Sequence, residues 1–98
     1  MSQLENYLIY AVHYSDEPYK KHITQVKLTR FNVTSMPYKN EVVDAINEGK
    51  KFYTYYRDRL GEWQVGKQII VEIIDGESYI KTERNGIKAD NLGNLPTY

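Results

Sequence analysis

The order of apolar and polar residues predicts a sheet that is interrupted by one helix. Residues 6–14 (NYLIYAVHY) and residues 22–32 are rich in aromatic and β-branched side chains, which is typical of strands. The turn-forming cluster at residues 15–18 separates the two segments. We therefore expect them to pair as antiparallel strands.

The next segment has the spacing of a helix. Ser35 is a suitable N-cap residue, and Pro37 suits a first helical turn. Gly49 suits the position just after a helix, where a left-handed backbone is common. The apolar stripe of this helix consists of Val42, Val43, Ala45 and Ile46.

The second half of the chain returns to strand patterns. Further strands are predicted at residues 51–56, 68–74 and 78–82. Asp75-Gly76 is a strong hairpin signal, and Asn85-Gly86 is a second one. The predicted order is ββαβββ, which describes one small domain of the α+β class, with a mostly antiparallel sheet, over residues 1–98.

The first strand is apolar on both faces. In a regular strand Leu8 and Val12 lie on one side, and Ile9 and Ala11 lie on the other. One short helix cannot cover both faces of a sheet. Either the sheet curls onto itself as a small barrel, or another subunit covers the second face. We expect a homo-oligomer, namely a tetramer.

Residues 84–98 combine apolar anchors with turn-forming residues. The anchors are Leu92, Leu95 and Tyr98. Between them lie Asp90, Asn91 and Asn94, whose side chain types commonly hydrogen-bond the backbone of turns. This pattern predicts an ordered, irregular segment that packs on the domain. Asn91 and Asn94 either cap turns only or also contact a ligand.

Composition excludes several classes of function. The chain has no cysteine and two isolated histidines, so no metal site is expected. It lacks the phosphate-binding, dinucleotide and metalloprotease motifs, so we expect neither an enzyme nor a cofactor. No apolar run is long enough for a membrane helix, which favours a cytoplasmic protein without a membrane partner. The net charge of zero argues against a DNA or RNA partner.

Binding chemistry is better represented than catalysis. Ten tyrosines against two phenylalanines provide rings that either stack on a ligand or line half-exposed strands. The loops and hairpins of the second half are expected to hold the cations Arg57, Arg59, Lys81, Arg84 and Lys88. Asp90, Asn91 and Asn94 can contact a base edge, since an amide offers both a donor and an acceptor. Together these groups suit a nucleotide-sized ligand, whereas isolated charged hairpins are usually only solvated.

The end of the chain resembles the C-terminal signature of a family of small, uncharacterised proteins of Gram-positive bacteria and their phages. That signature is a strand ending in Tyr-(Ile/Leu)-x-Thr, a glycine turn, Asp-Asn-Leu-x-x-Leu-Pro and an aromatic residue. The matching positions are Tyr79 to Thr82, Asp90 to Leu92, Leu95-Pro96 and Tyr98. The segments 9–13, 23–27 and 45–49 also resemble the family, although His13 stands where the family usually carries Arg or Lys.

The chain is also similar to phage immune-evasion sponges of the anti-CBASS kind. These small oligomeric proteins bind cyclic dinucleotides such as 3′,3′-cGAMP without degrading them. The resemblance implies a sponge for a cyclic nucleotide defence signal in the cytoplasm of the host bacterium. In that reading Arg84 and Lys88 neutralise phosphates, and Tyr10, Tyr14 or Tyr98 stacks on a base. Asp90, Asn91 and Asn94 then contact base or ribose edges.

Two other functions remain open from the sequence. A protein–protein interaction module would use the tyrosine-rich surface to meet a partner protein. A nucleic-acid binder would use the basic residues Lys20, Lys21, Lys27 and Arg30 with neighbouring tyrosines.

Overall fold

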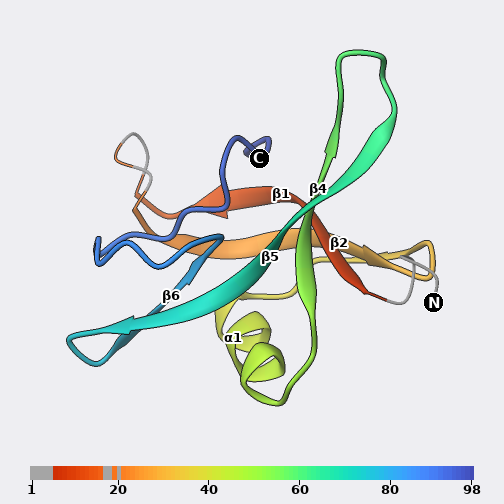
Figure 1. The fold of residues 1–98 in the computed structure, drawn as a ribbon. Helices are drawn as coiled ribbons and strands as arrows, with labels where there is room; N and C mark the ends of the chain where they lie inside the picture. The colour runs from red at the N-terminus through yellow and green to blue at the C-terminus, as the bar shows by residue number, and fades with distance from the viewer. Residues whose placement is uncertain (1–5, 17–18, 20) are drawn as a thin grey trace.

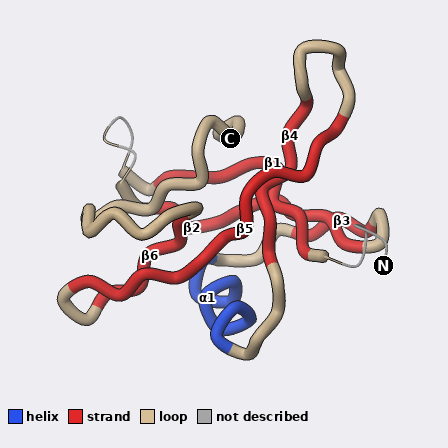
Figure 2. Tube along the Cα trace, in the orientation of Figure 1, coloured by secondary structure: helices blue, strands red, loops and turns tan. Residues whose placement is uncertain are grey.

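A computed structural model describes residues 6–16, 19 and 21–98 of the chain. The described part contains one helix and a six-stranded sheet, which confirms the α+β class (Figures 1 and 2). The elements in chain order are β1 (Tyr7–Tyr14), β2 (Ile23–Arg30), β3 (Val33–Ser35), α1 (Lys39–Asn47), β4 (Phe52–Arg57), β5 (Trp63–Ile74) and β6 (Glu77–Lys81).

The strand order in the sheet is β3-β2-β1-β4-β5-β6. β1 and β2 pair antiparallel, as the sequence predicted, with Leu8 opposite Thr29. β1 and β4 are parallel neighbours, with Tyr7 opposite Phe52, and α1 lies on the connection that brings the chain back between them. The remaining pairs are antiparallel. β1 therefore lies at the centre of the sheet, where both of its edges are paired.

The helix begins later than its sequence signals suggest. Tyr38, not Ser35, is the N-cap residue, and the Glu41 carboxylate accepts the Tyr38 N–H at 3.1 Å. The prediction for Ser35 is wrong because this residue pairs with Leu28 as the last residue of β3. Pro37 consequently precedes the helix and does not form its first turn. Gly49 follows the helix with φ of 98°, as predicted.

The short strand β3 was absent from the predicted order. Phe31 and Asn32 both have positive φ, at 52° and 62°, and together reverse the chain between β2 and β3. A two-residue turn of this kind matches the twist of antiparallel strands. The predicted second strand therefore ends at Arg30 and is followed by a tight hairpin. The turn predicted at residues 15–18 includes Glu17 and Pro18, which lie outside the described residues.

Both faces of β1 are covered within one chain. Leu8, Ile9, Ala11 and Val12 are all buried. Tyr10 is an extra residue in the β1–β2 register, because Ile9 lies opposite Leu28 and Ala11 lies opposite Lys27. This bulge places both Ile9 and Val12 in the core cluster with α1 residues and the tail. β1 thus provides no reason for a second subunit, and the homo-oligomer stays a prediction.

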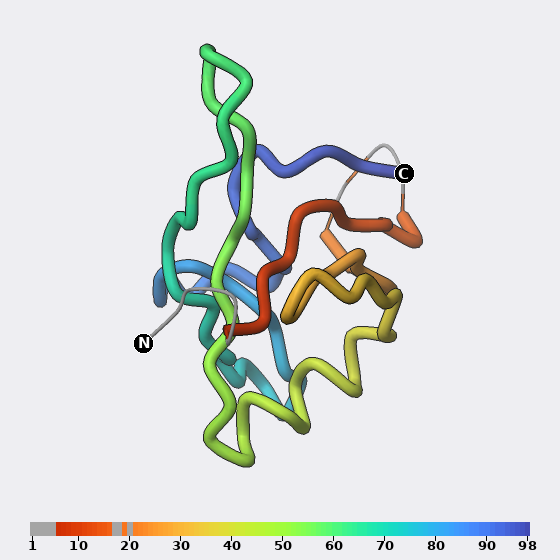
Figure 3. The backbone as a smooth tube through the Cα atoms, turned by 90° about the vertical axis from the view of Figure 1, so that its right-hand side faces the viewer, coloured from red at the N-terminus to blue at the C-terminus, as the bar shows by residue number. Residues whose placement is uncertain are grey.

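The segment after β6 packs on the domain as an ordered tail, which confirms that prediction. Leu92 and Leu95 belong to the core. The Asn91 N–H donates to the Ile80 carbonyl of β6 at 3.0 Å. Further along, the Val12 N–H of β1 donates to Pro96 O at 2.9 Å. The tail therefore joins β6 to β1, and the sheet curls to allow this, as Figure 3 shows from the side.

Asn85-Gly86 does not form the predicted hairpin between strands. β6 is the last strand, and the chain after it turns and comes back to form a parallel bridge between Lys81 and Asn91. The Asn85 carboxamide oxygen accepts the Ile87 N–H at 3.0 Å, so this side chain stabilises a local turn. No helix within the described ranges is long and apolar enough to span a membrane.

Candidate functional site

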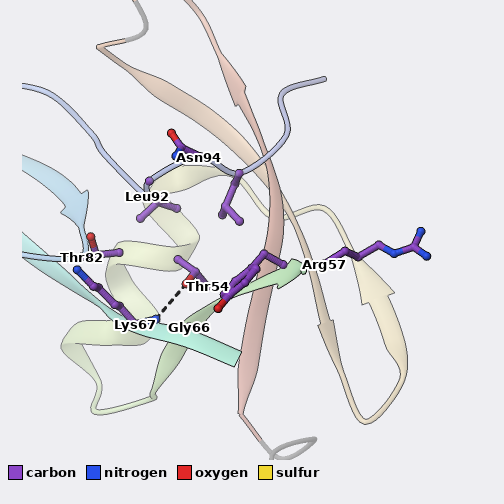
Figure 4. A pocket seen from close by; sticks show the side chains of 10 residues that line it. Thr54, Arg57, Gly66, Lys67, Thr82, Leu92 and Asn94 are labelled. Atoms are coloured by element: carbon purple, nitrogen blue, oxygen red, sulfur yellow. Dashed lines mark hydrogen bonds between the residues drawn. The ribbon is translucent and has the colours of Figure 1, made fainter. Parts of the chain in front are cut away.

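A hollow of the described surface lies between the β4–β5 ribbon and the tail, and we call it the tail cleft (Figure 4). Its volume is about 470 Å³, within the range of small-molecule sites. It is lined by Thr54, Tyr56, Arg57, Gly66, Lys67, Thr82, Leu92, Gly93, Asn94 and Leu95. Three separate parts of the chain therefore meet at one hollow.

A bulge in β5 shapes the sheet side of the tail cleft. Tyr53 lies opposite Gln68 and Tyr55 opposite Val65, so two β5 residues, Gly66 and Lys67, face Thr54 alone. The Thr54 hydroxyl oxygen accepts the Lys67 N–H at 3.1 Å, shown as the dashed line in Figure 4. A Cβ atom at residue 66 would lie 2.3 Å from this oxygen. Only glycine fits so close an approach.

Among the residues that the structure describes, those lining the tail cleft include cations and no carboxylate. The Lys67 side chain runs toward Thr82, whereas the Arg57 guanidinium points away from the cleft (Figure 4). That guanidinium lies 5.8 Å from the Trp63 ring centroid, and its Nε donates to Gly61 O at 3.3 Å. Lys67 forms no ion pair with any described residue. Its ammonium is therefore the cation of the cleft that is available to an anion.

The tail forms the opposite wall. Leu92 and Leu95 are buried and provide apolar contact area, while the Asn94 amide between them is exposed. Tyr56, on the sheet side, is 43% exposed, so a face or edge of its ring is available to a ligand. The arrangement combines one available cation, an aromatic ring, hydroxyls and an amide around an apolar floor.

Two of the residues predicted to contact a ligand instead form hydrogen bonds within the protein. Asp90 is buried, and its carboxylate accepts the N–H groups of Ile23 and Ile80, both at 2.8 Å, and the Lys39 ammonium at 2.9 Å. Asn91 is exposed, but its side-chain oxygen accepts the Gly93 N–H at 2.9 Å. These bonds shape the tail, so Asp90 and Asn91 position the cleft wall.

Arg57 lines the tail cleft, but three other predicted cations, Arg84, Lys88 and Lys81, lie away from it. Arg84 lines a shallow groove beside the C-terminal end of α1, together with Lys50 and Lys51. Lys88 forms an ion pair with Asp75 at the β5–β6 turn. Lys81, expected in a loop or hairpin, is a buried residue of β6 whose ammonium binds Glu72 and Asn85. Lys81 therefore lies in the β5–β6 hairpin, as predicted, but its buried ammonium is bound within the fold and does not face a ligand.

The three tyrosines predicted to stack on a base do not line the tail cleft either. Tyr10 lies beside Trp63, with ring centroids 6.1 Å apart. Tyr14 lines a hollow formed with residues 93–97, so it lies near Asn94. Tyr98 packs near His13, and the Lys27 ammonium lies 4.6 Å from its ring centroid. Of the eight predicted residues, Asn94 alone lines the tail cleft.

Several residues of the cleft were missed from the sequence. Lys67 and Thr54 belong to strands, and their meeting depends on the bulge at Gly66. Gly66 next to a lysine, just before the apolar run Ile69–Val71, was the available signal, because glycine in a strand often marks a bulge. Part of the basic stretch considered for nucleic acid, Lys20, lies outside the described residues.

Comparison with known proteins assigns the chain to a family. A family model described as protein of unknown function, DUF3892, matches residues 8–96. The chain belongs to the DUF3892 family. This agrees with the expected membership in a family of small uncharacterised proteins. The match to the DUF3892 model covers both the sheet and the tail of this chain. Neither a curated protein nor a solved structure matches the chain.

Proposed function

We propose that this DUF3892 protein binds a small anionic ligand with a planar ring, of the nucleotide class, in the tail cleft. The observation that supports the proposal is the lining of the cleft. The lining contains the available Lys67 ammonium and the exposed Tyr56 ring, and none of its described residues is a carboxylate that would repel an anion.

Each chemical part of a nucleotide has a partner in this lining. Lys67 neutralises a phosphate, and Thr82 adds a hydroxyl on the same side of the cleft. A base stacks on Tyr56, a contact that contributes about 1–3 kcal/mol. Asn94 reads a base or ribose edge with its amide. Leu92 and Leu95 cover the apolar part of the ligand and exclude water.

The resemblance to immune-evasion sponges narrows the proposal to a cyclic dinucleotide such as 3′,3′-cGAMP. A sponge holds its ligand unchanged and must compete with the natural receptor, which requires an affinity near the nanomolar range, about −12 kcal/mol. The homo-oligomer belongs to this proposal, since a second chain would enclose a ligand that one open cleft leaves partly exposed.

The experiment is isothermal titration of the full chain with 3′,3′-cGAMP, followed by recovery of the nucleotide and its mass spectrum. We expect saturable binding and an intact nucleotide. Lys67→Ala should weaken binding about tenfold or more, because it removes the phosphate partner. Asn94→Ala should weaken it less. Light scattering of the same sample measures the number of subunits.

Lys88→Ala is the matched control, because it also removes one surface lysine but lies away from the tail cleft. If Lys88→Ala and Arg84→Ala weaken binding while Lys67→Ala does not, the ligand binds where the sequence alone placed it and the cleft assignment is wrong. Absence of binding to 3′,3′-cGAMP, other cyclic dinucleotides and trinucleotides would contradict the proposed function itself. A cleaved nucleotide would contradict the sponge.

A further inference from the structure

A second hollow lies on the other side of the β4–β5 ribbon, and we call it the aromatic hollow. Its volume is about 320 Å³, and it is lined by Tyr10, Thr29, Asn32, Thr34, Tyr55 and Trp63. Tyr55 neighbours Thr54 and Tyr56, which line the tail cleft, and side chains alternate between the faces of a strand. The two hollows therefore share β4 but no lining residue.

Three aromatic rings form one wall of the aromatic hollow. The Trp63 and Tyr55 rings are stacked, with centroids 4.8 Å apart and planes 20° apart. The Tyr10 ring stands at 80° to the Trp63 ring, with centroids 6.1 Å apart. Trp63 is 46% exposed. The rings thus hold each other in place and still present apolar area to a partner.

Short polar side chains form the other wall. Thr29 and Thr34 lie directly opposite each other in the β2–β3 pair, so two hydroxyls stand side by side. Asn32 belongs to the tight turn between these strands and has φ of 62°. This wall is fixed by a strand pair and its turn, and its groups need little ordering when they bind a partner.

Among the described residues, those that line the aromatic hollow have hydrogen-bonding groups and include no Asp, Glu, Lys or Arg. The Arg57 guanidinium lies beside this lining, 5.8 Å from the Trp63 ring centroid. None of the six lining side chains forms a hydrogen bond to another residue in the part of the chain that the structure describes. The indole N–H, two phenols, two hydroxyls and an amide are therefore all available to a partner.

The geometry points to a docking site for a proline-rich, extended segment of a partner protein. Such a segment forms a polyproline II helix, in which the carbonyl groups have no internal hydrogen bonds and proline has no N–H. It therefore needs donors and apolar rings, which the aromatic hollow supplies, and it needs no charged partner. Aromatic-lined grooves are the common receptors for this conformation. The described residues that line this hollow are different from those that line the tail cleft, so this site is independent of the proposed function.

Trp63 provides the readout, because it is the only tryptophan of the chain. We would titrate the full chain with decaproline and follow the fluorescence of Trp63. The expected result is a saturable shift of the emission, which a glycine–serine peptide of the same length does not produce. A neutral oligosaccharide, which would also use rings and hydroxyls, is titrated in parallel.

Two variants test the location. Tyr10→Ala removes a ring and should weaken decaproline binding about tenfold, as is common for an aromatic residue at the centre of an interface. Tyr55→Phe keeps the ring and removes one donor, so it should weaken binding less, without a loss of fold. Lys67→Ala, in the tail cleft, should leave decaproline binding unchanged.

Three results would overturn the inference. They are no saturable response to decaproline, a response to the oligosaccharide alone, and unchanged affinity in both Tyr10→Ala and Tyr55→Phe. A failure of 3′,3′-cGAMP binding would not affect it, because the two probes report on different hollows.

Discussion

At the scale of single residues, Asp90 shows how a polar side chain can be mistaken for a binding group. Its carboxylate holds β2 through Ile23, β6 through Ile80 and α1 through Lys39. The sequence separations of these bonds are 67, 10 and 51 residues. The residue pattern of the tail predicts that it is ordered, but the role of Asp90 could not be predicted because its partners come together only in the folded chain.

We predict that Asp90→Ala is strongly destabilising. The change leaves two buried backbone N–H groups and the Lys39 ammonium without their acceptor, and losing one partner of a buried ion pair costs about 3–5 kcal/mol. Urea unfolding followed by circular dichroism measures the loss. Asn94→Ala, on the exposed side of the same segment, should change the free energy of unfolding by less than about 0.5 kcal/mol. Equal effects of the two changes would contradict this role.

The lowered pKa of Glu72 predicts that the stability of the fold decreases at acidic pH. The hydrogen bond from the buried Lys81 ammonium, against an opposing effect of burial, lowers the pKa of Glu72 below its ordinary value of 4.5. Since the folded state has the lower pKa, the stabilisation is complete above pH 4.5 and is lost as the pH falls through the folded value. Urea unfolding at pH 7, 5, 4 and 3 should show this decrease.

Glu72→Gln is the variant that tests the assignment. It should be less stable than the natural chain at pH 7 and should lose less stability between pH 5 and pH 3. A variant with an unchanged pH profile would show that other carboxylates dominate. Asp58 also has a lowered pKa, mainly through the hydrogen bond from the Glu62 N–H, and contributes with the same sign.

At the scale of elements, the sequence located five of the six strands, but the strand predicted at residues 68–74 is only the C-terminal part of β5, which begins at Trp63. The strand predicted at residues 51–56 is β4 with a shift of one residue, and Asp75-Gly76 forms the predicted turn between β5 and β6. β3 was missed because it has three exposed residues and follows a Phe31-Asn32 turn that carries no glycine. The early start predicted for the helix failed because Ser35 is used in a strand pair.

Because Gly66 forms the bulge beside the tail cleft, we expect its replacement by alanine to affect both the stability of the fold and nucleotide binding. A Cβ atom there would lie 2.3 Å from Thr54 Oγ1 and 3.2 Å from Tyr56 Cε1, so both side chains must move. We expect Gly66→Ala to cost about 1–3 kcal/mol in unfolding free energy and to weaken nucleotide binding in the tail cleft. Thermal unfolding and isothermal titration measure the two effects.

Gly76→Ala is the control for this change. It places a Cβ in open space at the β5–β6 turn, where φ is 81°, so it strains the backbone without touching the tail cleft. A similar loss of stability with unchanged nucleotide affinity is expected. If both alanine variants bind equally well, Gly66 does not shape the site.

At the scale of the whole molecule, the closing of the sheet by the tail was the feature hardest to predict. Because β1 is apolar on both faces, the sequence predicted either a sheet that curls onto itself or a second subunit that covers the other face. The second subunit was the favoured alternative. Within one chain, the Tyr10 bulge and the tail bury the apolar residues of β1. The tail cleft could not be predicted because β4, β5 and the tail form it only after this closure.

We predict that Leu95→Ala weakens the packing of the tail on the core and its pairing with β1. Leu95 is buried in the core and also lines the tail cleft, so its truncation should cost about 2–5 kcal/mol. Hydrogen exchange should show lower protection of the Val12 and Tyr98 amides, which pair the tail with β1. Leu60→Ala, at a leucine that is 85% exposed, should have little effect on either measurement. Unchanged protection in Leu95→Ala would mean that the pairing alone holds the tail.

The tail also determines when the protein can fold during synthesis. A ribosome releases β1 early, but Pro96 and Tyr98, which pair with Val12, and the core residues Leu92 and Leu95 emerge only after all six strands. β4 pairs with β1 only as far as Ile9, so until the tail emerges the rest of this edge of β1 is open, and open strand edges bind other chains. A product that stops before residue 90 lacks the Asp90 bonds and two core leucines. The cell would therefore degrade products that are interrupted before the tail, and chains that include the tail would persist.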